Sequence, residues 1–256
     1  MPPRPPIGFL PMAGAGRRLG TYGFAKELIP LVTRAPGGDA EARPVCDFAL
    51  RAVRAAGAER CIVAVSPDKA EILRQLRDGA PVGLALAYVV QPAPLGLPDA
   101  IRAARPFLGD ADVVMALPDT LLFPLDALAL ARAHQVATGA DLVLGVFPVA
   151  EPERLGPVEI GDDGRVLRVH DKPARAPVAN SWGCAAWSSR FADYLDEAEA
   201  RRTGPGEGIL GHIFEQARAD GLGVRAVAFA DGALVDVGTP AGYQEALAEL
   251  ERRGLW

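Results

Sequence analysis

The amino-acid sequence predicts an α/β fold, with a mostly parallel central sheet covered by helices on both faces. Short apolar runs recur along the 256 residues, and segments with apolar residues at three-and-four spacing lie between them. The runs are apolar at nearly every position, which is typical of strands that are buried on both faces. Strands that alternate with helices in this way form parallel sheets with crossover helices.

The expected strands of the first half cover residues 7–12, 61–65, 84–90, 112–117 and 141–149. The helices expected between them cover residues 45–56, 67–77, 97–107 and 125–137. The stretch TRAPGGDAEARP, residues 33–44, is expected to form a surface loop because small and turn-forming residues dominate it. Parallel sheets bind ligands at the carboxyl ends of their strands, so the residues after each strand are the candidates for a site.

The second half changes character and indicates a small mixed-sheet extension. Its short strand candidates are GPVEI, GRVLRVHD and NSWGCAAW, and the GDDG between the first two predicts a hairpin turn because Asp-Gly tolerates positive φ angles. Helices at 190–201 and 208–219, a strand at 224–230 and a last helix from Thr239-Pro240 to Gly254 are expected to follow. We expect a single domain over residues 1–256.

Composition excludes several classes of protein. Half of the residues are hydrophobic, 23% are charged and the formal net charge is −5, which gives no sign of a basic nucleic-acid surface. The N-terminus is too rich in proline for a signal peptide, and no apolar run approaches the roughly 18 residues of a membrane span. We therefore expect a cytoplasmic protein that binds neither nucleic acid nor membrane. The three cysteines form no CxxC pair and are expected to be buried apolar residues.

The stretch LPMAGAGRRLGTYGFAKELIPL, which begins at the first expected strand, contains a candidate phosphate-binding loop. Gly14 and Gly16 leave backbone N–H groups bare, and such groups can form a concave anion site. Arg17, Arg18 and Lys26 add positive charge. The combination suits a ligand with several negative charges, such as a triphosphate.

A dinucleotide-binding turn is an alternative for this loop. That turn needs the spacing G-x-G-x-x-G and an acid about twenty residues further on, at the tip of the second strand. Here the third glycine, Gly20, comes one residue late, and residues 36–42 show no strand pattern. A nicotinamide-dependent dehydrogenase is therefore disfavoured, while a plain surface turn stays open as a second alternative.

The loop resembles the signature G-x-G-T-R-(x)-P-K-x-L-x-P of the sugar-1-phosphate nucleotidyltransferases, a family that includes glucose-1-phosphate thymidylyltransferase and UTP-glucose-1-phosphate uridylyltransferase. It reads GAGRRL from Gly14 and KELIP from Lys26, with Arg17 in the place of the usual Thr. The resemblance implies catalytic phosphate contacts from Arg18 and Lys26. It implies nucleotide contacts from Ala13, Gly14, Ala15, Gly16 and Arg17.

The segment VVQPAPLGLPDAIRAARPFL, residues 89–108, resembles the family's Q-x-x-P-x-G-L-x-x-A segment. The resemblance implies that Gln91 reads the base and that Gly96 lies against it. A glutamine amide offers one donor and one acceptor, which match the O4 and N3–H edge of uracil or thymine. A polar cap at the end of a strand is the alternative for Gln91.

Two acids are implied to hold Mg²⁺, the expected cofactor. Asp119 follows the expected strand 112–117, and DVGTP at residues 236–240 resembles the family's D-x-G-T-P segment. The resemblance assigns Asp119, which is also a catalytic residue, and Asp236 to the metal. Two carboxylates suit this ion, which otherwise binds water and substrate phosphate oxygens. A turn cap is the alternative for Asp119.

Residues 155–187 resemble the family's stretch G-V-V-E-x-D-x-x-G-x-V-x-x-x-x-E-K-P-x-x-P-x-S-N. The resemblance implies sugar contacts from Gly156, Glu159, Asp171 and Lys172. It makes Lys172 a catalytic residue that contacts the sugar phosphate, with an exposed turn as the alternative. His170 is expected to be a strand-surface histidine, because the attacking phosphate oxygen is already ionised. The acid of the family's Thr-Asp pair is missing from GEGILGHIFEQA, residues 206–217.

Together these matches imply a Rossmann-like nucleotide-diphospho-sugar transferase fold, with a nucleotide-binding half at residues 7–150 and a sugar-binding half at residues 151–256. They imply an enzyme that joins a nucleoside triphosphate, with UTP or dTTP favoured, to a sugar-1-phosphate and releases pyrophosphate. Two alternatives stay open: a cytidylyltransferase for phosphocholine or another alcohol phosphate, and a non-catalytic nucleotide-sugar-binding subunit. A homo-oligomer is compatible with the sequence.

Overall fold

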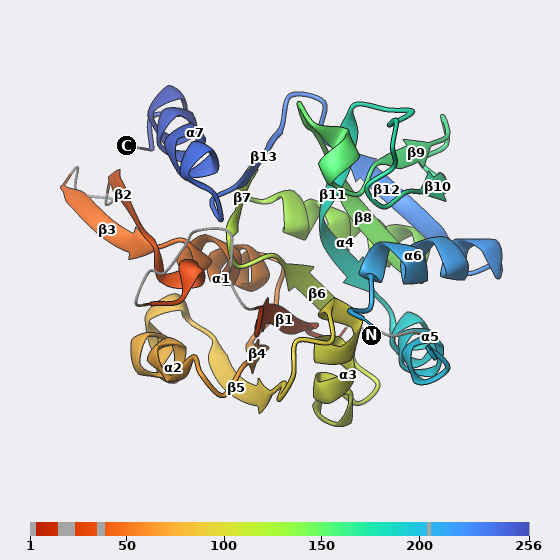
Figure 1. Ribbon diagram of the computed structural model, residues 1–256, viewed down its shortest axis with the longest axis horizontal. Coiled ribbons are helices and arrows are strands. Elements are labelled where there is room, and N and C mark those ends of the chain that lie inside the picture. Colours follow the sequence, from red (N-terminus) through yellow and green to blue (C-terminus); the bar gives the residue numbers. More distant parts are fainter. Residues whose placement is uncertain (1–3, 15–23, 35–38, 204–205, 256) are drawn as a thin grey trace.

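A seven-stranded sheet forms the centre of the computed structural model, which describes residues 4–14, 24–34, 39–203 and 206–255 (Figure 1). Its strand order is β12-β8-β11-β6-β1-β4-β5. The strands are β1 (Ile7–Met12), β4 (Arg60–Val65), β5 (Ala85–Val90), β6 (Val113–Ala116), β8 (Leu142–Pro148), β11 (Asn180–Trp187) and β12 (Val224–Ala228). Neighbouring strands are parallel except that β11 runs antiparallel to β6 and β8, which confirms the mostly parallel sheet.

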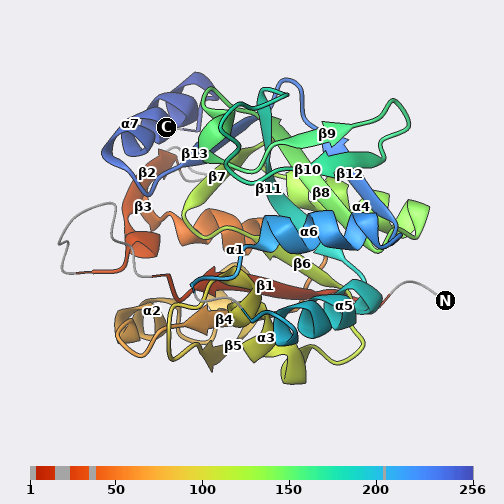
Figure 2. The same ribbon diagram turned by 45° about the vertical axis from the view of Figure 1, so that its right-hand side comes forward.

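Helices cover both faces of this sheet. They are α1 (Cys46–Ala55), α2 (Ala70–Leu76), α3 (Leu97–Leu108), α4 (Ala127–Thr138), α5 (Ser189–Ala200) and α6 (Leu210–Ala219), whereas α7 (Pro240–Arg252) packs outside this sheet in a third core. Phe9 of β1 packs in one core with α3, α5 and α6, whereas Leu10, the next residue, packs in a second core with α1, α2 and α4. Figure 2 shows α3, α5 and α6 along one side of the sheet. The alternation follows from the two-residue period of a strand.

The expected strands and helices of the first half are confirmed, and two expectations about strands are wrong. Residues 33–44 are not a plain loop, because β2 (Pro30–Arg34) and β3 (Ala40–Pro44) pair antiparallel, and buried Leu31 ties the pair to the core. The NSWGCAAW strand is not part of a small extension. It is β11, near the middle of the central sheet, and its last five residues are buried. That continuous burial is the mark of a central strand.

Two further small sheets stand outside the central one. The expected hairpin is confirmed as β9 (Val158–Ile160) and β10 (Val166–Val169), with a turn in which Gly164 N donates to Gly161 O at 2.9 Å. The second sheet pairs β7 (Thr120–Phe123) antiparallel with β13 (Ala233–Asp236), and the register sets Asp236 opposite Thr120. This pairing joins the segment after β6 to the segment before the last helix.

The last helix, α7, packs against the paired strands β7 and β13 (Figure 1). It begins as expected at a Thr239 cap, whose hydroxyl accepts from Gly242 N at 3.0 Å. Its buried Leu250 lies in one cluster with Val235 of β13 and Phe123 of β7. The position of Asp236 therefore depends on this small core. In the described part of the chain, no helix combines the length and apolar character needed to cross a membrane.

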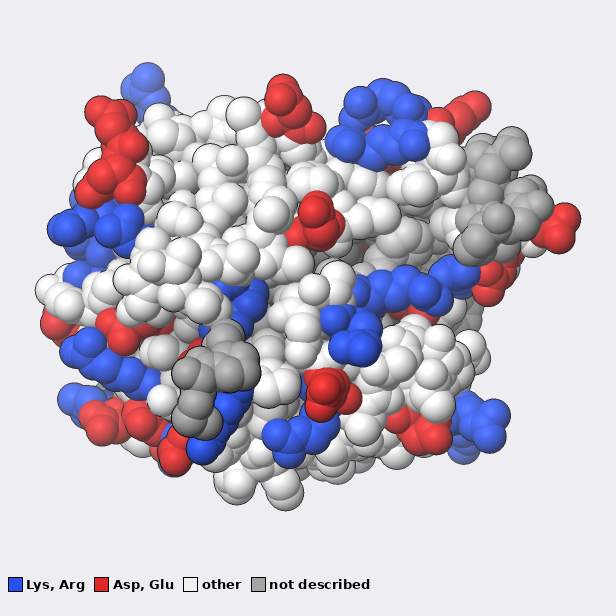
Figure 3. All heavy atoms as spheres, turned by 180° about the vertical axis from the view of Figure 1, so that it is seen from behind, with Lys and Arg blue, Asp and Glu red and all other residues white. Residues whose placement is uncertain are grey.

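Acidic and basic side chains are interspersed over the face seen in Figure 3. Their mixing matches the modest net charge of −5. Positive charge for a phosphate ligand must therefore be supplied locally, by a few side chains in one place.

We expect Leu250→Ala to lower the free energy of unfolding by about 2–5 kcal/mol, because the leucine is fully buried against β7 and β13 and its loss leaves a cavity. Urea denaturation measures the change. Leu130→Ala on α4 is the matched control, since that leucine is 44% exposed, and it should cost less than about 1 kcal/mol. Equal costs for the two variants would contradict the packing described.

Candidate active site

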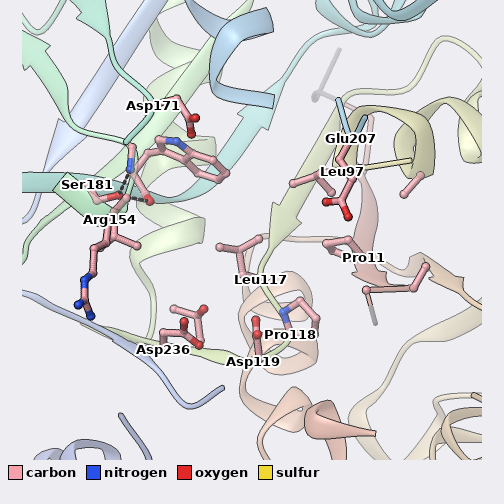
Figure 4. Close-up of a pocket in the computed structure, with 18 of the residues that line it drawn as sticks. Pro11, Leu97, Leu117, Pro118, Asp119, Arg154, Asp171, Ser181, Glu207 and Asp236 are labelled. Carbon is pink, nitrogen blue, oxygen red and sulfur yellow. Dashed lines mark hydrogen bonds between the residues drawn. The ribbon is translucent and has the colours of Figure 1, made fainter. Parts of the chain in front are cut away.

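A cavity of about 640 Å³ opens at the carboxyl ends of β1, β5 and β6 (Figure 4). One wall is built from residues that directly follow these three strands, and the opposite wall carries the ends of β10 and β11. This is the edge at which a parallel sheet binds its ligands. The cavity therefore lies between the two halves that the sequence distinguishes.

Most of the described residues that the sequence singles out line this cavity. They are Ala13, Gly14, Lys26, Gln91, Gly96, Asp119, Gly156, Asp171, Lys172 and Asp236. Glu159 is not among the lining residues. Four further candidates, Ala15, Gly16, Arg17 and Arg18, lie outside the described residues.

Lys26 and Asp119 form an ion pair at one end of the cavity. Lys26 lies on a short 3-10 helix, η2 (Lys26–Leu28), and both side chains are largely buried. Burial by itself lowers the pKa of Lys26, but the carboxylate of Asp119, with help from Glu27 and Asp236, raises that pKa above its ordinary value. Lys26 is therefore a fixed positive charge at neutral pH.

Asp119 and Asp236 are far apart in sequence and meet through the β7 and β13 pair. Val237 N donates to Asp119 O at 2.9 Å, and Gly238 N donates to Asp236 Oδ1 at 2.8 Å. A Cβ atom on Gly238 would lie 2.7 Å from Asp236 Oδ1 and 3.4 Å from Asp119 Oδ2, so the two carboxylates lie beside the same glycine. Figure 4 shows the two carboxylates at the same end of the cavity.

A buried ion pair anchors the segment that carries Lys26. Lys69 Nζ lies 2.7 and 2.9 Å from the two carboxylate oxygens of Glu27, and it also donates to Met12 O at 2.9 Å. Glu27 is 1% exposed. Because Met12 ends β1 and Lys69 precedes α2, this one ammonium group fixes η2 to the sheet and to a helix. The sequence patterns did not reveal the pair, since its members are 42 positions apart.

Gln91 is almost completely buried directly after β5, and its amide nitrogen makes two hydrogen bonds within the protein. Nε2 donates to Gly96 O at 2.9 Å and to Asp99 Oδ2 at 2.8 Å. Both partners are pure acceptors, so the chemistry fixes the orientation of the amide. The expected pairing of a ligand with both the donor and the acceptor is therefore not available: the two amide protons are used within the protein, and Oε1 is left.

Gly96 lies where two loops cross. Its φ of +102° suits glycine, and a Cβ atom there would lie 2.2 Å from Gly208 O. Gly208 N donates to Leu95 O at 2.7 Å, which fixes the crossing. The segment before α6, including the cavity residue Glu207, is thereby held against the wall that carries Gln91.

Lys172 and Asp171 enter the opposite wall directly after β10. Lys172 adopts the left-handed backbone conformation, with a φ of +41°, and its N donates to Leu155 O at 2.9 Å. Left-handed backbone at a residue other than glycine costs energy, so the surrounding structure must hold Lys172 in this conformation. Figure 4 shows the Asp171 carboxylate on the side of the cavity away from Asp119.

Glu159 and His170 face each other on the small hairpin. His170 Nε2 lies 2.7 Å from Glu159 Oε1, and their strands β9 and β10 are paired. Glu159 thus has a protein partner instead of a place in the cavity lining. His170 directly follows β10 instead of lying in the strand, and its side chain is only 18% exposed, so the expected strand-surface position is not what the structure shows.

Several lining residues were not anticipated from the sequence. They include Leu97, Arg154, Leu155, Ser181, Trp182 and Glu207. Arg154 and Leu155 directly precede Gly156, so their position beside a predicted sugar-binding residue could have indicated that they line the cavity. In the described ranges no group of three or more His, Cys, Asp or Glu side chains gathers as a metal cage.

Comparison with known proteins gives the family. Residues 12–253 match the model of the family described as "Nucleotidyl transferase", and the chain belongs to that family. It is 32% identical to glucose-1-phosphate thymidylyltransferase of Streptomyces griseus over 163 residues. This aligned stretch covers 63% of this chain and 43% of the relative. The chain is 29% identical over 171 residues to the enzyme of that name from Neisseria meningitidis, covering 66% and 56%. The chain matches about half the length of these curated relatives.

Solved structures show the same fold. A UDP-glucose pyrophosphorylase complexed with UDP-glucose superposes with a TM-score of 0.79 at 19% identity, over 98% of this chain and 100% of the other. A UTP-bound UGPase from Acinetobacter baumannii gives a TM-score of 0.77 at 22% identity, over 98% and 96%. The expected nucleotidyltransferase fold is confirmed.

We expect Lys69→Met to lower the free energy of unfolding by about 3–5 kcal/mol, because it leaves the Glu27 carboxylate buried without its partner. Urea denaturation at neutral pH measures this. The double variant Glu27→Leu with Lys69→Met should recover most of the loss, since no unpaired charge then remains. A single variant that unfolds like the unmodified protein would show that the pair does not anchor η2.

Proposed function

We propose that the protein transfers a nucleotidyl group from a nucleoside triphosphate to a sugar-1-phosphate, giving a nucleotide sugar and pyrophosphate. One observation carries this proposal. The Lys26 ammonium and the carboxylates of Asp119 and Asp236 meet at one end of a cavity whose opposite wall presents Lys172 and Asp171. Membership of the nucleotidyl transferase family supports it.

The reaction needs charge and position more than covalent help from the protein. An ionised oxygen of the sugar-1-phosphate attacks the α-phosphorus of the triphosphate, the bond from that phosphorus to the β-phosphate bridging oxygen breaks, and pyrophosphate leaves. The nucleophile is already deprotonated, so no general base is required. Holding the two phosphates in line and neutralising their charge supplies the catalysis.

The side chains divide these tasks. Lys26 holds the triphosphate and the departing pyrophosphate, because its ammonium group stays charged at neutral pH. Lys172 aligns the phosphate of the sugar, and Asp171 accepts hydrogen bonds from sugar hydroxyl groups. Arg18 and the backbone of the glycine loop would add phosphate contacts. Gln91 Oε1 accepts the N3–H of uracil or thymine, so UTP or dTTP is the favoured nucleotide.

Asp119 and Asp236 would hold Mg²⁺. One oxygen atom of each carboxylate lies close to Gly238, and two carboxylates that open on a cavity suit this hard cation, which also binds phosphate oxygens. When bound, the ion would neutralise phosphate charge that develops during transfer. Without a bound cation, the same two carboxylates would repel a triphosphate, so a cation between them would favour binding of the triphosphate.

A matrix of nucleoside triphosphates against sugar-1-phosphates, read by pyrophosphate release, tests the proposal. Turnover with UTP or dTTP and a sugar-1-phosphate supports it. Turnover confined to CTP and phosphocholine would instead favour a cytidylyltransferase. Binding of nucleotide sugars without pyrophosphate release from any pair would favour a non-catalytic subunit.

We expect Asp119→Asn to lower the rate of pyrophosphate release by about a thousandfold, because the variant loses a carboxylate that faces the reacting phosphates. Asp163→Asn, in the exposed turn of the hairpin, is the matched control and should keep its rate. Circular dichroism and thermal melting check that both variants fold. Near-normal turnover by Asp119→Asn would contradict the catalytic role proposed for Asp119.

Chelation of divalent ions should abolish pyrophosphate release, and added Mg²⁺ should restore it. Asp236→Asn should raise the Mg²⁺ concentration needed for half-maximal rate, because one of two carboxylate ligands is lost. A titration of rate against Mg²⁺ for both proteins gives the comparison. Turnover that persists in excess chelator would rule out the metal.

A further inference from the structure

We propose that Asp99 is a positioning residue that sets the base selectivity of this site by fixing the amide of Gln91. The inference rests on the proposed function only in taking a nucleoside triphosphate as the ligand. Asp99 lies in the first turn of α3, and its carboxylate contacts the glutamine amide from outside the cavity lining.

The geometry gives Gln91 one orientation. Its backbone N donates to Val65 O at 2.9 Å, which fixes the residue at the end of β5. One proton of Nε2 goes to Gly96 O at 2.9 Å and the other to Asp99 Oδ2 at 2.8 Å. Turning the amide by half a rotation would set Oε1 against two acceptors in a site that is 4% exposed. Loss of two buried hydrogen bonds opposes that rotation.

The fixed amide selects among bases. It presents Oε1 alone, so it accepts a hydrogen bond from the N3–H of uracil or thymine. The N3 of cytosine carries no proton and is itself an acceptor, so it faces Oε1 with no bond between them. A glutamine free to rotate would serve cytosine with Nε2 instead. Asp99 therefore excludes cytosine through Gln91, without contact between Asp99 and the base.

The experiment compares the ratio of kcat/KM for UTP to kcat/KM for CTP in a double-mutant cycle. Its members are the unmodified protein, Asp99→Leu, Gln91→Met and the double variant. We expect Asp99→Leu to lower the ratio about tenfold, as expected for one hydrogen bond. Gln91→Met should lower it at least as far. In the Gln91→Met background, Asp99→Leu should have no further effect.

Two controls separate selectivity from folding. Asp99→Asn keeps an acceptor for Nε2 but can also turn its own amide and donate to Oε1, so it should lower the ratio less than Asp99→Leu does. Asp196→Leu removes an acid that also contacts α3, through Arg102 at 3.1 Å, but not Gln91, and it should leave the ratio unchanged. If Asp99→Leu does not fold, Asp99→Ala takes its place in the cycle with the same expectation.

The outcomes distinguish this inference from the proposed function. A folded Asp99→Leu that keeps its UTP preference, or an effect of Asp99→Leu that persists beside Gln91→Met, overturns the role of Asp99 while turnover upholds the reaction. If the unmodified protein releases no pyrophosphate, the reaction fails. Equilibrium dialysis of UTP and CTP then measures the same ratio as binding and decides the role of Asp99 by itself.

Discussion

The antiparallel pairing of β7 with β13 places Asp236 opposite Thr120, next to Asp119, so that carboxylates from two distant parts of the chain reach the same end of the cavity. Both strands are short, and their hold on each other comes from a small apolar core that α7 completes. Burial lowers the pKa of Lys26, and Asp119, with smaller contributions from Glu27 and Asp236, raises it above its ordinary value. The packing of α7 against β13 thus helps to place the Asp236 carboxylate near the Lys26 ammonium group.

Charge balance explains how the parts of this site depend on one another. Two carboxylates and one ammonium group, taken from the described residues at this end of the cavity, leave a net negative charge. Such a surface opposes the approach of a polyanion. A divalent cation bound to a triphosphate would lower this barrier, because it cancels two of the negative charges of the ligand. The Lys26 ammonium has three protons, so it can keep Asp119 and still donate to a phosphate oxygen.

Sequence patterns predicted the central sheet because its strands are continuous apolar runs, and local composition is enough to reveal those. They missed β7 and β13, since a four-residue strand whose partner lies more than a hundred positions away has no local signature. They misjudged residues 33–44 because the pairing of β2 with β3 comes from backbone hydrogen bonds and from buried Leu31, not from composition. The NSWGCAAW strand was predicted in the wrong sheet for a related reason, because a strand pattern does not show which strands it pairs with.

For the site, motif and strand order together found the residues that follow strands, such as Gln91 and Asp119. Sequence patterns could not find the residues that hold these side chains in place. Asp99 fixes the amide of Gln91 and Lys69 anchors the segment of Lys26, and both contacts are tertiary. Glu159, in contrast, matched a motif but turns to His170 rather than to the cavity.

The crossing of Gly96 and Gly208 has a mechanical consequence. With no side chain at either position, the two backbones touch directly, and Gly96 O holds the amide of Gln91. A displacement of the segment before α6 would therefore move the wall that carries Gln91, because no side chain lies between the two backbones. This contact therefore joins a loop of the first half directly to a loop of the second half, in addition to the pairing of β11 with β6 and of β13 with β7.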